Sequence, residues 1–341
     1  MNKLFVHLGP CRTGSTALQT FLFQQHKDIN YLGKPYKFNG HINFSHIMGL
    51  NEKKFIQLSK NLENKINKIY LDSKKTNLLS DENFLNFFSH ANFNYVRTIG
   101  RINDLFKKKG VELNLFYFIR NQEEILPSYF LQNFSILKSI FKVNDFYKII
   151  MENLREKNNN GWINHLLNQF KYYDIHENLL TIAGKNVKFF FYEKFKHKET
   201  EFLDELSEYL EISKDETRKI MIGKKEHVST ARIQNPNEFI TNPNDFGVGT
   251  KIYESLLNNI VYKEEILKNF KRKTVTFFGL MKELFPSFRS KRKRNIKENN
   301  EEAIALYKKL NKENLQINKF YHENNVLFQE KYSSDLIKLN Y

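Results

Sequence analysis

Residues 5–16 read Phe-Val-His-Leu-Gly-Pro-Cys-Arg-Thr-Gly-Ser-Thr. The apolar run Leu4–Leu8 predicts a strand, the segment after it a loop, and the helical spacing over Gly14–Gln25 a helix. A strand, loop and helix in this order form a favourable site for an anion, because backbone N–H groups converge there and the helix dipole adds to their attraction. The two glycines permit the turn and a close approach of the backbone to a ligand.

The loop differs from the nucleotide-triphosphatase pattern GxxxxGK[ST] at one position. Gly9 and Gly14 have the required spacing, but Ser15 stands where that pattern has lysine, and the loop carries its cation at Arg12 instead. This arrangement suits a single anionic group beyond a 5′-phosphate better than a pair of β and γ phosphates. The alternative is an ordinary strand–turn–helix whose glycines only close the turn.

Further apolar runs alternate with helical patterns along the first two thirds of the chain. Strands are predicted at Asn77–Ser80, Leu113–Ile119 and Val187–Tyr192, and a helix is predicted where Phe202, Leu206, Tyr209 and Leu210 recur. Near-continuous apolar strands are typical of parallel sheets covered on both faces. The predicted fold is therefore α/β, a P-loop-type three-layer αβα arrangement around a central parallel sheet.

The last third has a different pattern. Asn-Pro turns at 235–236 and 242–243 precede a basic run, Arg289 with Lys291–Arg294, and a helical stretch then covers about residues 301–330, with polar interruptions at Glu313 and Asn324. No linker is evident. We expect one domain over residues 1–341, with a core of about 1–235 and a helical C-terminal extension of about 236–341.

A second stretch with chemical character follows the third predicted strand. Arg120 stands where that strand ends, and Asn121 with Glu124 has the spacing of a helix N-cap and its capping-box partner. Ser128 falls about two turns into the helix, directly after Pro127. Taken alone, this arginine can equally be a surface residue and this serine an ordinary helical one.

Composition narrows the class of partner. The chain has 341 residues and a net charge of +16, which indicates an anionic partner: nucleic acid, an anionic membrane surface or a phosphorylated small molecule. A coding bias toward Lys, Asn, Phe and Ile explains the charge equally well. The single cysteine, Cys11, excludes an intramolecular disulfide framework. No apolar run reaches 18 residues, and Lys3–Gly9 is too short for a signal peptide, so we expect a cytoplasmic protein without a transmembrane segment.

Together, the two stretches resemble the sulfotransferases that use 3′-phosphoadenosine-5′-phosphosulfate (PAPS). In that family a P-[KR]-[ST]-G-[ST]-T loop holds the 5′-phosphosulfate, and Pro10–Thr16 is similar to it with one additional residue after the proline. An arginine at a strand end with a serine eight residues later holds the 3′-phosphate, and Arg120 and Ser128 match that spacing. The continuation Thr16–Gln19 is similar to the bacterial, glycan-type branch.

Three further stretches, which are less specific, add to the resemblance. Leu78–Glu82 is similar to a family strand that ends in Ser-x-Glu, and Phe191–Phe195 to a strand end at which the tyrosine, here Tyr192, lies near the adenine. Phe320–Asn325 and the tail to Tyr341 are similar to the closing helix of bacterial members. Arg12 departs from the more common lysine. The family's Arg-Lys-Gly loop is not visible, although three basic residues fall in the corresponding part of the chain: Lys224, Lys225 and Arg232. A tryptophan that stacks on adenine in some members would fall near Ala17, so that stacking must come from elsewhere.

The resemblance implies a role for each site residue, with PAPS as the donor and no metal. Arg12 contacts the phosphosulfate and the charge that develops on the leaving phosphate. Glu82 is the expected catalytic base, with Asp81 and His90 as alternatives, and His7 orients the loop. The remaining donor-binding residues divide between the 5′-phosphate (Thr13, Gly14, Ser15 and Thr16), the 3′-phosphate (Arg120 and Ser128) and the adenine (Tyr192).

Two other function classes stay open. One is a P-loop kinase-like ATP phosphotransferase, for which Asn77–Asp81 is the nearest counterpart of a strand ending in a magnesium-binding aspartate. The other is a non-enzymatic protein that binds nucleic acid or anionic lipid through Arg289–Arg294. The expected acceptor is a hydroxyl or amine of a glycan, with Trp162 either stacking on a sugar or filling the core or its rim. We expect no specific nucleic-acid partner, and peripheral membrane contact stays open.

Overall fold

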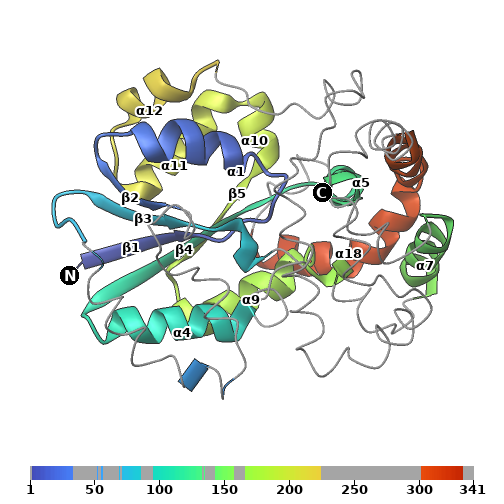
Figure 1. Cartoon of the computed structure of the whole chain (residues 1–341), viewed down its shortest axis with the longest axis horizontal. Coiled ribbons are helices and arrows are strands. Elements are labelled where there is room, and N and C mark those ends of the chain that lie inside the picture. Colours follow the sequence, from blue (N-terminus) through green and yellow to red (C-terminus); the bar gives the residue numbers. More distant parts are fainter. Residues whose placement is uncertain are drawn as a thin grey trace, which may run out of the picture. The chain divides into compact units, whose positions relative to one another are not determined.

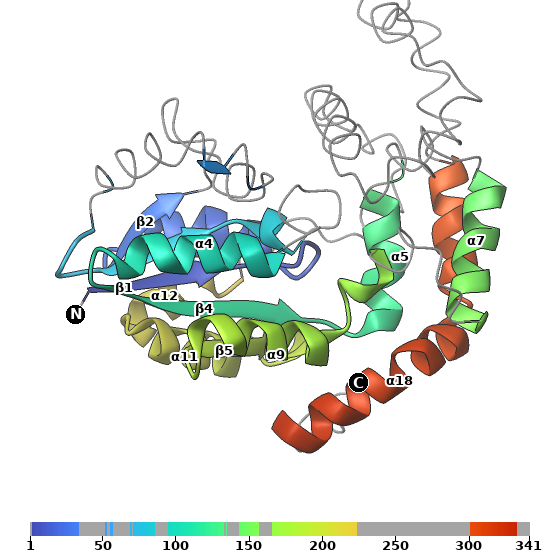
Figure 2. The ribbon, with the colours of Figure 1, turned by 90° about the horizontal axis from the view of Figure 1, so that it is seen from below.

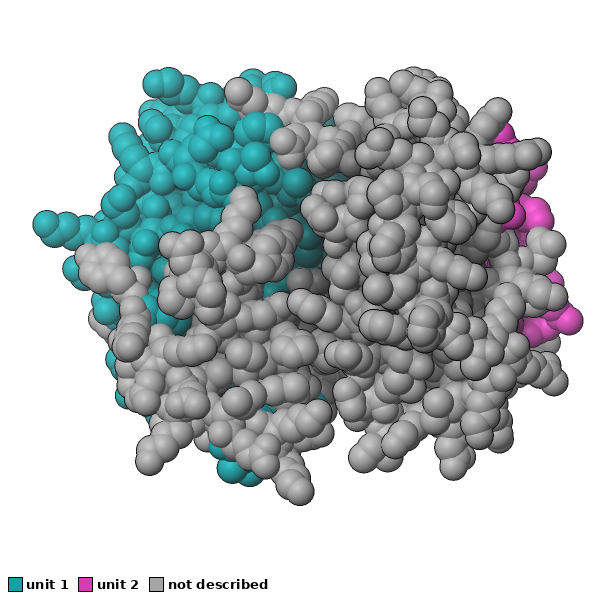
Figure 3. All heavy atoms as spheres, in the orientation of Figure 1, with its two compact units in different colours: residues 1–122, 165–226, 321–341 teal, residues 123–164, 227–320 magenta. Residues whose placement is uncertain are grey.

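The computed structural model describes residues 2–33, 52, 55–56, 69, 71–85, 95–132, 134, 143–156, 166–223 and 301–332. The chain divides into two compact units, which Figure 3 colours teal and magenta. Unit 1 comprises Met1–Gln122, His165–Glu226 and Tyr321–Tyr341, and unit 2 comprises Glu123–Asn164 and His227–Phe320. The predicted boundary between core and extension, near residue 235, lies outside the described residues and stays a prediction.

Unit 1 is built on a parallel sheet. Among the described residues the sheet has five strands, in the order β2 (Ile29–Gly33), β3 (Thr76–Ser80), β1 (Asn2–His7), β4 (Val111–Ile119) and β5 (Val187–Phe191) (Figure 1). Every neighbouring pair is parallel, and the register aligns His7 with Ser80 on one side and with Phe116 on the other. The predicted parallel sheet is therefore confirmed.

Helices cover both faces of this sheet. One face carries α1 (Ser15–Ala17), the π-helix η1 (Leu18–Phe23), α11 (Glu199–Leu210) and α12 (Lys214–Met221). The other face carries α4 (Tyr95–Lys107) and α9 (Tyr172–Ala183), which contact β4 and each other. Figure 1 shows the three layers, and Figure 2 views the sheet from the α4 and α9 side. This confirms the predicted three-layer α/β fold.

The side chains of β4 alternate between the two faces of the sheet, so this one strand contacts the helices on both sides. Phe116 and Phe118 belong to the core formed with η1 and α11, where they pack against Leu22 and Phe202. Tyr117 points to the opposite face, and its hydroxyl lies 3.1 Å from Nδ1 of His176 on α9. Successive strand residues face opposite sides of a sheet, so a continuously apolar strand fits a sheet that is buried on both sides.

Two local features differ from the sequence prediction. Strand β2 was not anticipated, because its sequence Ile-Asn-Tyr-Leu-Gly is short and carries a polar residue, as suits the edge of a sheet. The helix predicted over Gly14–Gln25 begins at Ser15 as expected but widens to a π-helix at Leu18–Phe23. This widened turn buries Leu18, Gln19, Leu22 and Phe23 together against the sheet.

Residues 301–332, the described part of the C-terminal region, are helical apart from one turn, as predicted. Residues 301–310 form one helix, and α18 (Asn314–Tyr332) follows after a turn at 311–313. The chain therefore breaks at the predicted interruption near Glu313 but not at Asn324. Asn324 is buried within α18, where its side chain accepts from the Tyr173 N–H at 3.0 Å and donates to Asp174 at 3.0 Å. A buried amide with both groups paired is tolerated inside a helix.

Unit 2 contains a small helical cluster. It includes α7 (Val143–Glu156), residues 301–310, and the parts of α5 (Gln122–Gln132) and α18 that fall within this unit. The Tyr147 hydroxyl donates to Glu313 at 2.5 Å, and Phe130 packs edge-on against Phe146. These contacts join α7 to α5 and to the turn that precedes α18.

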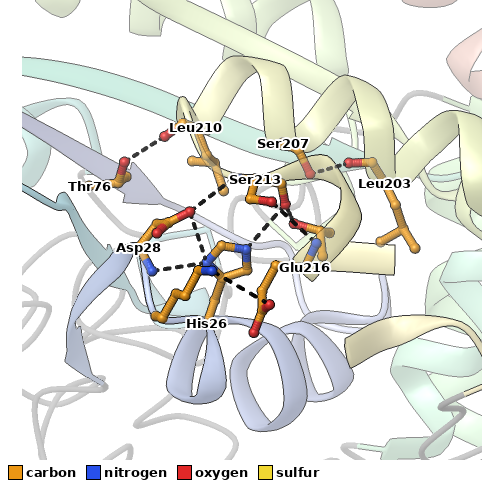
Figure 4. Close-up of polar contacts among 10 residues, drawn as sticks. His26, Asp28, Thr76, Leu203, Ser207, Leu210, Ser213 and Glu216 are labelled. Atoms are coloured by element: carbon orange, nitrogen blue, oxygen red, sulfur yellow. Dashed lines mark hydrogen bonds and ion pairs between the residues drawn. The ribbon is translucent and has the colours of Figure 1, made fainter. Parts of the chain in front are cut away.

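A network of polar contacts lies at the end of the sheet where the parallel strands begin (Figure 4). Nε2 of His26 lies 3.3 Å from the Ser213 carbonyl, and its Nδ1 accepts the Asp28 N–H at 3.2 Å, so the ring proton is on Nε2. The Ser213 N–H donates to Asp28, and Thr76 donates to the Leu210 carbonyl. These bonds connect the starts of β2 and β3 to the turn between α11 and α12. This turn lies at the amino-terminal end of the strands, opposite the end at which the predicted loop lies.

Candidate functional site

In unit 1, most of the predicted site residues follow the carboxyl ends of four parallel strands, so they lie at the same end of the sheet. The ladder between β1 and β4 extends into the loop, because the Phe118 N–H donates to the Gly9 carbonyl at 3.1 Å. The Asp81 N–H donates to the His7 carbonyl at 3.0 Å, and Ile119 aligns with Phe191. Ligands of open α/β sheets bind at this end.

The loop after β1 makes two close backbone approaches at its glycines. Gly9 has φ +99°, and a Cβ there would lie 3.0 Å from both Cα and the carbonyl oxygen of Glu82. Gly14 has φ +79°, and a Cβ there would lie 2.8 Å from Cε1 of Phe195. The first contact places the backbone of Glu82 against the start of the loop. The second places Phe195 of α10 (Tyr192–His197) against its end.

Arg12 adopts a left-handed backbone conformation with φ +72°. This conformation costs a non-glycine residue about 1–2 kcal/mol. Left-handed residues in a loop turn successive N–H groups toward a common point and so form an anion-binding concavity. With Arg12 and Gly14 both left-handed, and with helix α1 opening at Ser15, the backbone has the pattern that such a loop requires.

The loop hydroxyls stabilise the loop itself. Thr13 Oγ1 donates to the Pro10 carbonyl at 2.7 Å, and Ser15 Oγ donates to the same oxygen at 3.4 Å. Both side chains are buried, whereas Thr16 is exposed. In this structure both hydroxyls therefore donate within the loop. The amides of the first helical turn have no carbonyl partner within the helix and can donate to an anion.

A buried polar group lies beneath the loop. His7 Nδ1 lies 2.7 Å from Ser80 Oγ, and Gln19 donates to the same hydroxyl at 2.7 Å. The His7 ring also packs against Phe116 and Phe118, and all these side chains are buried. This arrangement joins β1, β3 and η1, and it favours the orienting role expected of His7 over a reactive one. The sequence did not single out Gln19.

The two adjacent acidic residues differ in their access to solvent. Asp81 is fully buried, whereas Glu82 is partly exposed and begins the short 3-10 helix η3 (Glu82–Phe84). Of the two residues, Glu82 is the more accessible to a ligand. This difference in access favours Glu82 over Asp81 as a base.

Arg120 reaches back to the loop from the end of β4. Its guanidinium donates through one NH group to the Arg12 carbonyl at 2.9 Å and lies 4.6 Å from the centre of the Tyr192 ring. A guanidinium over an aromatic face is a favourable cation–π arrangement. Residues 12, 120 and 192, predicted separately from sequence, are thus brought together.

The roles of the other predicted residues stay predictions. Ser128 is buried within α5 but belongs to unit 2. Its predicted role beside Arg120 therefore stays a prediction. The predicted residues outside the described part of the chain are His90, Trp162, Lys224, Lys225, Arg232 and the basic run Arg289–Arg294.

Replacing Gly14 by alanine is expected to destabilise the protein beyond the cost of its backbone conformation. The added methyl group would meet the Phe195 ring, which itself packs on Phe202 with centroids 4.8 Å apart. We expect a loss of about 1–3 kcal/mol in the free energy of unfolding beyond the conformational cost, measured by denaturant titration. Gly110→Ala is the matched control, since Gly110 has φ +68° and a Cβ there would meet no atom within 4 Å. Equal losses in the two variants would contradict the close approach of Phe195.

The described residues contain neither a metal-binding cluster nor a membrane-spanning helix. No group of three or more His, Cys, Asp or Glu side chains in the described ranges gathers as a metal site would. No helix in this part of the chain is long and apolar enough to cross a membrane.

Comparisons with known proteins give one distant similarity in structure. No protein-family model matches the chain, and no curated protein matches it significantly. A solved structure described as a sulfotransferase from Alicyclobacillus acidocaldarius aligns with a TM-score of 0.42 and 14% sequence identity. The alignment covers 73% of this chain and 95% of that one.

Proposed function

We propose that this protein is a sulfotransferase that moves the sulfuryl group of PAPS to a hydroxyl or amine of an acceptor, with a glycan as the expected acceptor. The observation that carries the proposal is the contact between Arg120 and the Arg12 carbonyl. This contact brings the guanidinium of Arg120, which follows β4, to the loop that carries Arg12. Two cations at a single loop fit a nucleotide that carries two separate anionic groups.

The loop provides the donors for the 5′ end of this nucleotide. In the proposed complex, backbone N–H groups of Thr13–Thr16 bind the 5′-phosphate, and the Arg12 guanidinium binds the phosphosulfate. Arginine presents a planar fork that can hold two oxygens at once. The left-handed backbone of Arg12 costs free energy at the point where the anion would lie. Strained backbone conformations of this kind are common at functional sites. Arg120, with Ser128, binds the 3′-phosphate, and Tyr192 contacts the adenine.

Glu82 is the proposed base. An acceptor hydroxyl attacks the sulfur in line with the bridging oxygen, a new S–O bond forms, and the bond between the sulfur and the bridging oxygen breaks. Glu82 takes the hydroxyl proton, and Arg12 stabilises the negative charge that develops on the departing 5′-phosphate. The partial exposure of Glu82 and the contact of its backbone with Gly9 support this role.

A magnesium-dependent ATP phosphotransferase is the second candidate. Asp81 follows β3, the strand next to β1, which is where such enzymes place a magnesium-binding aspartate. Two observations weigh against it: Ser15 occupies the position of the loop lysine, and Asp81 is fully buried.

Calorimetric titration with 3′,5′-adenosine diphosphate, 5′-AMP and ATP with Mg²⁺ separates these candidates. We expect 3′,5′-adenosine diphosphate to bind at least about 100-fold more tightly than 5′-AMP, because charge-assisted bonds to the second phosphate are strong. Preference for ATP with Mg²⁺ would favour the phosphotransferase. No nucleotide binding, together with salt-sensitive binding to random duplex DNA, would favour a non-enzymatic nucleic-acid-binding protein. A screen with sulfur-labelled PAPS and glycan acceptors then tests transfer itself.

A further inference from the structure

The step from β4 to α5 leaves two residues outside regular structure. Strand β4 ends at Ile119 and α5 begins at Gln122, so Arg120 and Asn121 lie between them and are half-buried. Backbone N–H and carbonyl groups in such a place need partners, which neither the sheet nor the helix provides. Two side chains to which the sequence assigned no role bond to these groups.

The hydroxyl of Tyr172 pairs with both backbone groups of Arg120. It donates to the Arg120 carbonyl at 2.7 Å and accepts the Arg120 N–H at 3.2 Å. Tyr172 is buried at the first position of α9, and burial raises the pKa of its phenol far above the ordinary value. The hydroxyl therefore keeps its proton at neutral pH and can donate.

The carboxylate of Glu193 holds the next residue. Its Oε1 accepts the Asn121 N–H at 2.9 Å, and the side chain is buried at the start of α10. The register between β4 and β5 explains why Asn121 and Glu193 lie close together. Ile119 aligns with Phe191 across the parallel pair of β4 and β5, so the chain positions that follow run side by side.

Fixing these backbone groups fixes the direction in which the Arg120 side chain leaves the chain. Its guanidinium then reaches the Arg12 carbonyl and lies over the Tyr192 ring. We infer that Tyr172 and Glu193 are positioning residues for Arg120, which set its guanidinium at the place where it binds the 3′-phosphate of the donor nucleotide. This inference rests on the proposed function.

The test must separate positioning from ordinary structural support. Tyr209→Phe is the matched control for Tyr172→Phe. Tyr209 is a largely buried phenol whose hydroxyl donates to the Leu115 carbonyl at 3.0 Å, also on β4, and burial raises its pKa as well. Each substitution removes one hydroxyl that bonds to the backbone of β4 or its end, but only Tyr172 contacts Arg120. The quantity measured is the selectivity, the dissociation constant of 5′-AMP divided by that of 3′,5′-adenosine diphosphate.

We expect Tyr172→Phe to lower this selectivity by about tenfold and Tyr209→Phe to leave it within about twofold. In an Arg120→Ala background, Tyr172→Phe should change the selectivity no further, because its effect passes through Arg120. An unchanged selectivity in Tyr172→Phe, with wild-type selectivity present, would overturn the inference and leave the proposed function standing. Absence of selectivity in the wild type would overturn the proposed function itself.

Glu193 provides a second and independent measurement if Tyr172→Phe does not fold. Glu193→Gln keeps an oxygen that accepts the Asn121 N–H, whereas Glu193→Ala removes it. We expect a selectivity loss of about fivefold or more in the alanine variant, with the glutamine variant within about threefold of the wild type. Equal selectivity in wild type and Glu193→Ala would overturn the assignment of Glu193. Equal losses in both variants would overturn it too, because the charge rather than the bond to Asn121 would then be what matters.

Discussion

Arg120→Ala is expected to weaken binding of 3′,5′-adenosine diphosphate by about 100-fold while weakening binding of 5′-AMP only several-fold. The large loss follows from removal of the guanidinium that would pair with the 3′-phosphate, since bonds between charged groups contribute more than neutral ones. The small loss follows from the bond to the Arg12 carbonyl, which the variant also removes from the loop. Calorimetric titration of wild type and variant with the two ligands measures both.

Two further variants test the specificity of this effect. Arg218→Ala removes the same charge from a site on α12 where the arginine pairs with Asp204 at 2.5 Å, and it should leave the preference for the 3′-phosphorylated ligand intact. Arg120→Lys keeps the charge but loses the planar fork, so it should recover only part of the affinity. If Arg120→Ala weakened both ligands equally, Arg120 would support the loop without binding a 3′-phosphate.

The fold was predictable where burial leaves a simple pattern. Strands β1, β3, β4 and β5 are near-continuously apolar because both faces of the sheet are covered, and all four were predicted within two residues of their observed ends. β2 was not predicted, because its sequence Ile-Asn-Tyr-Leu-Gly contains a polar residue and ends in glycine, so it does not stand apart from a loop. The π-helical turn at Leu18–Phe23 likewise leaves no sequence signal, because the same apolar residues fit an ordinary helix.

The candidate site, too, was predictable only where the sequence has a local pattern. Gly9, Arg12 and Gly14 could be singled out because a loop between a strand and a helix has a local sequence pattern. No role could be assigned to Tyr172 or Glu193, because their roles depend on hydrogen bonds to residues 52 and 72 positions away in the chain. One tyrosine among 17 is not distinguishable by type. Only the packing of α9 and α10 against the end of β4 identifies it.

Glu82→Gln is expected to lower the rate of sulfuryl transfer by at least about 100-fold, the usual contribution of a general base. The substitution keeps the size of the side chain and removes its ability to take a proton. Affinity for 3′,5′-adenosine diphosphate should stay within about threefold of the wild type, because in the proposed complex the nucleotide is bound by the loop and Arg120 and not by this carboxylate. Transfer from labelled PAPS to an acceptor found by screening, together with calorimetric titration, gives the two values.

The control for this variant is Glu112→Gln. Glu112 is partly exposed on β4 and accepts a bond from Asn186, but it aligns with Lys3 near the amino-terminal end of the strand, away from the loop. Near-normal transfer in Glu82→Gln would move the base elsewhere. Asp81 is then a poor substitute, because its carboxylate is fully buried. A large loss in turnover with intact nucleotide binding, seen in Glu82→Gln and not in Glu112→Gln, would therefore assign proton transfer to the one partly exposed carboxylate whose backbone packs against the start of the loop.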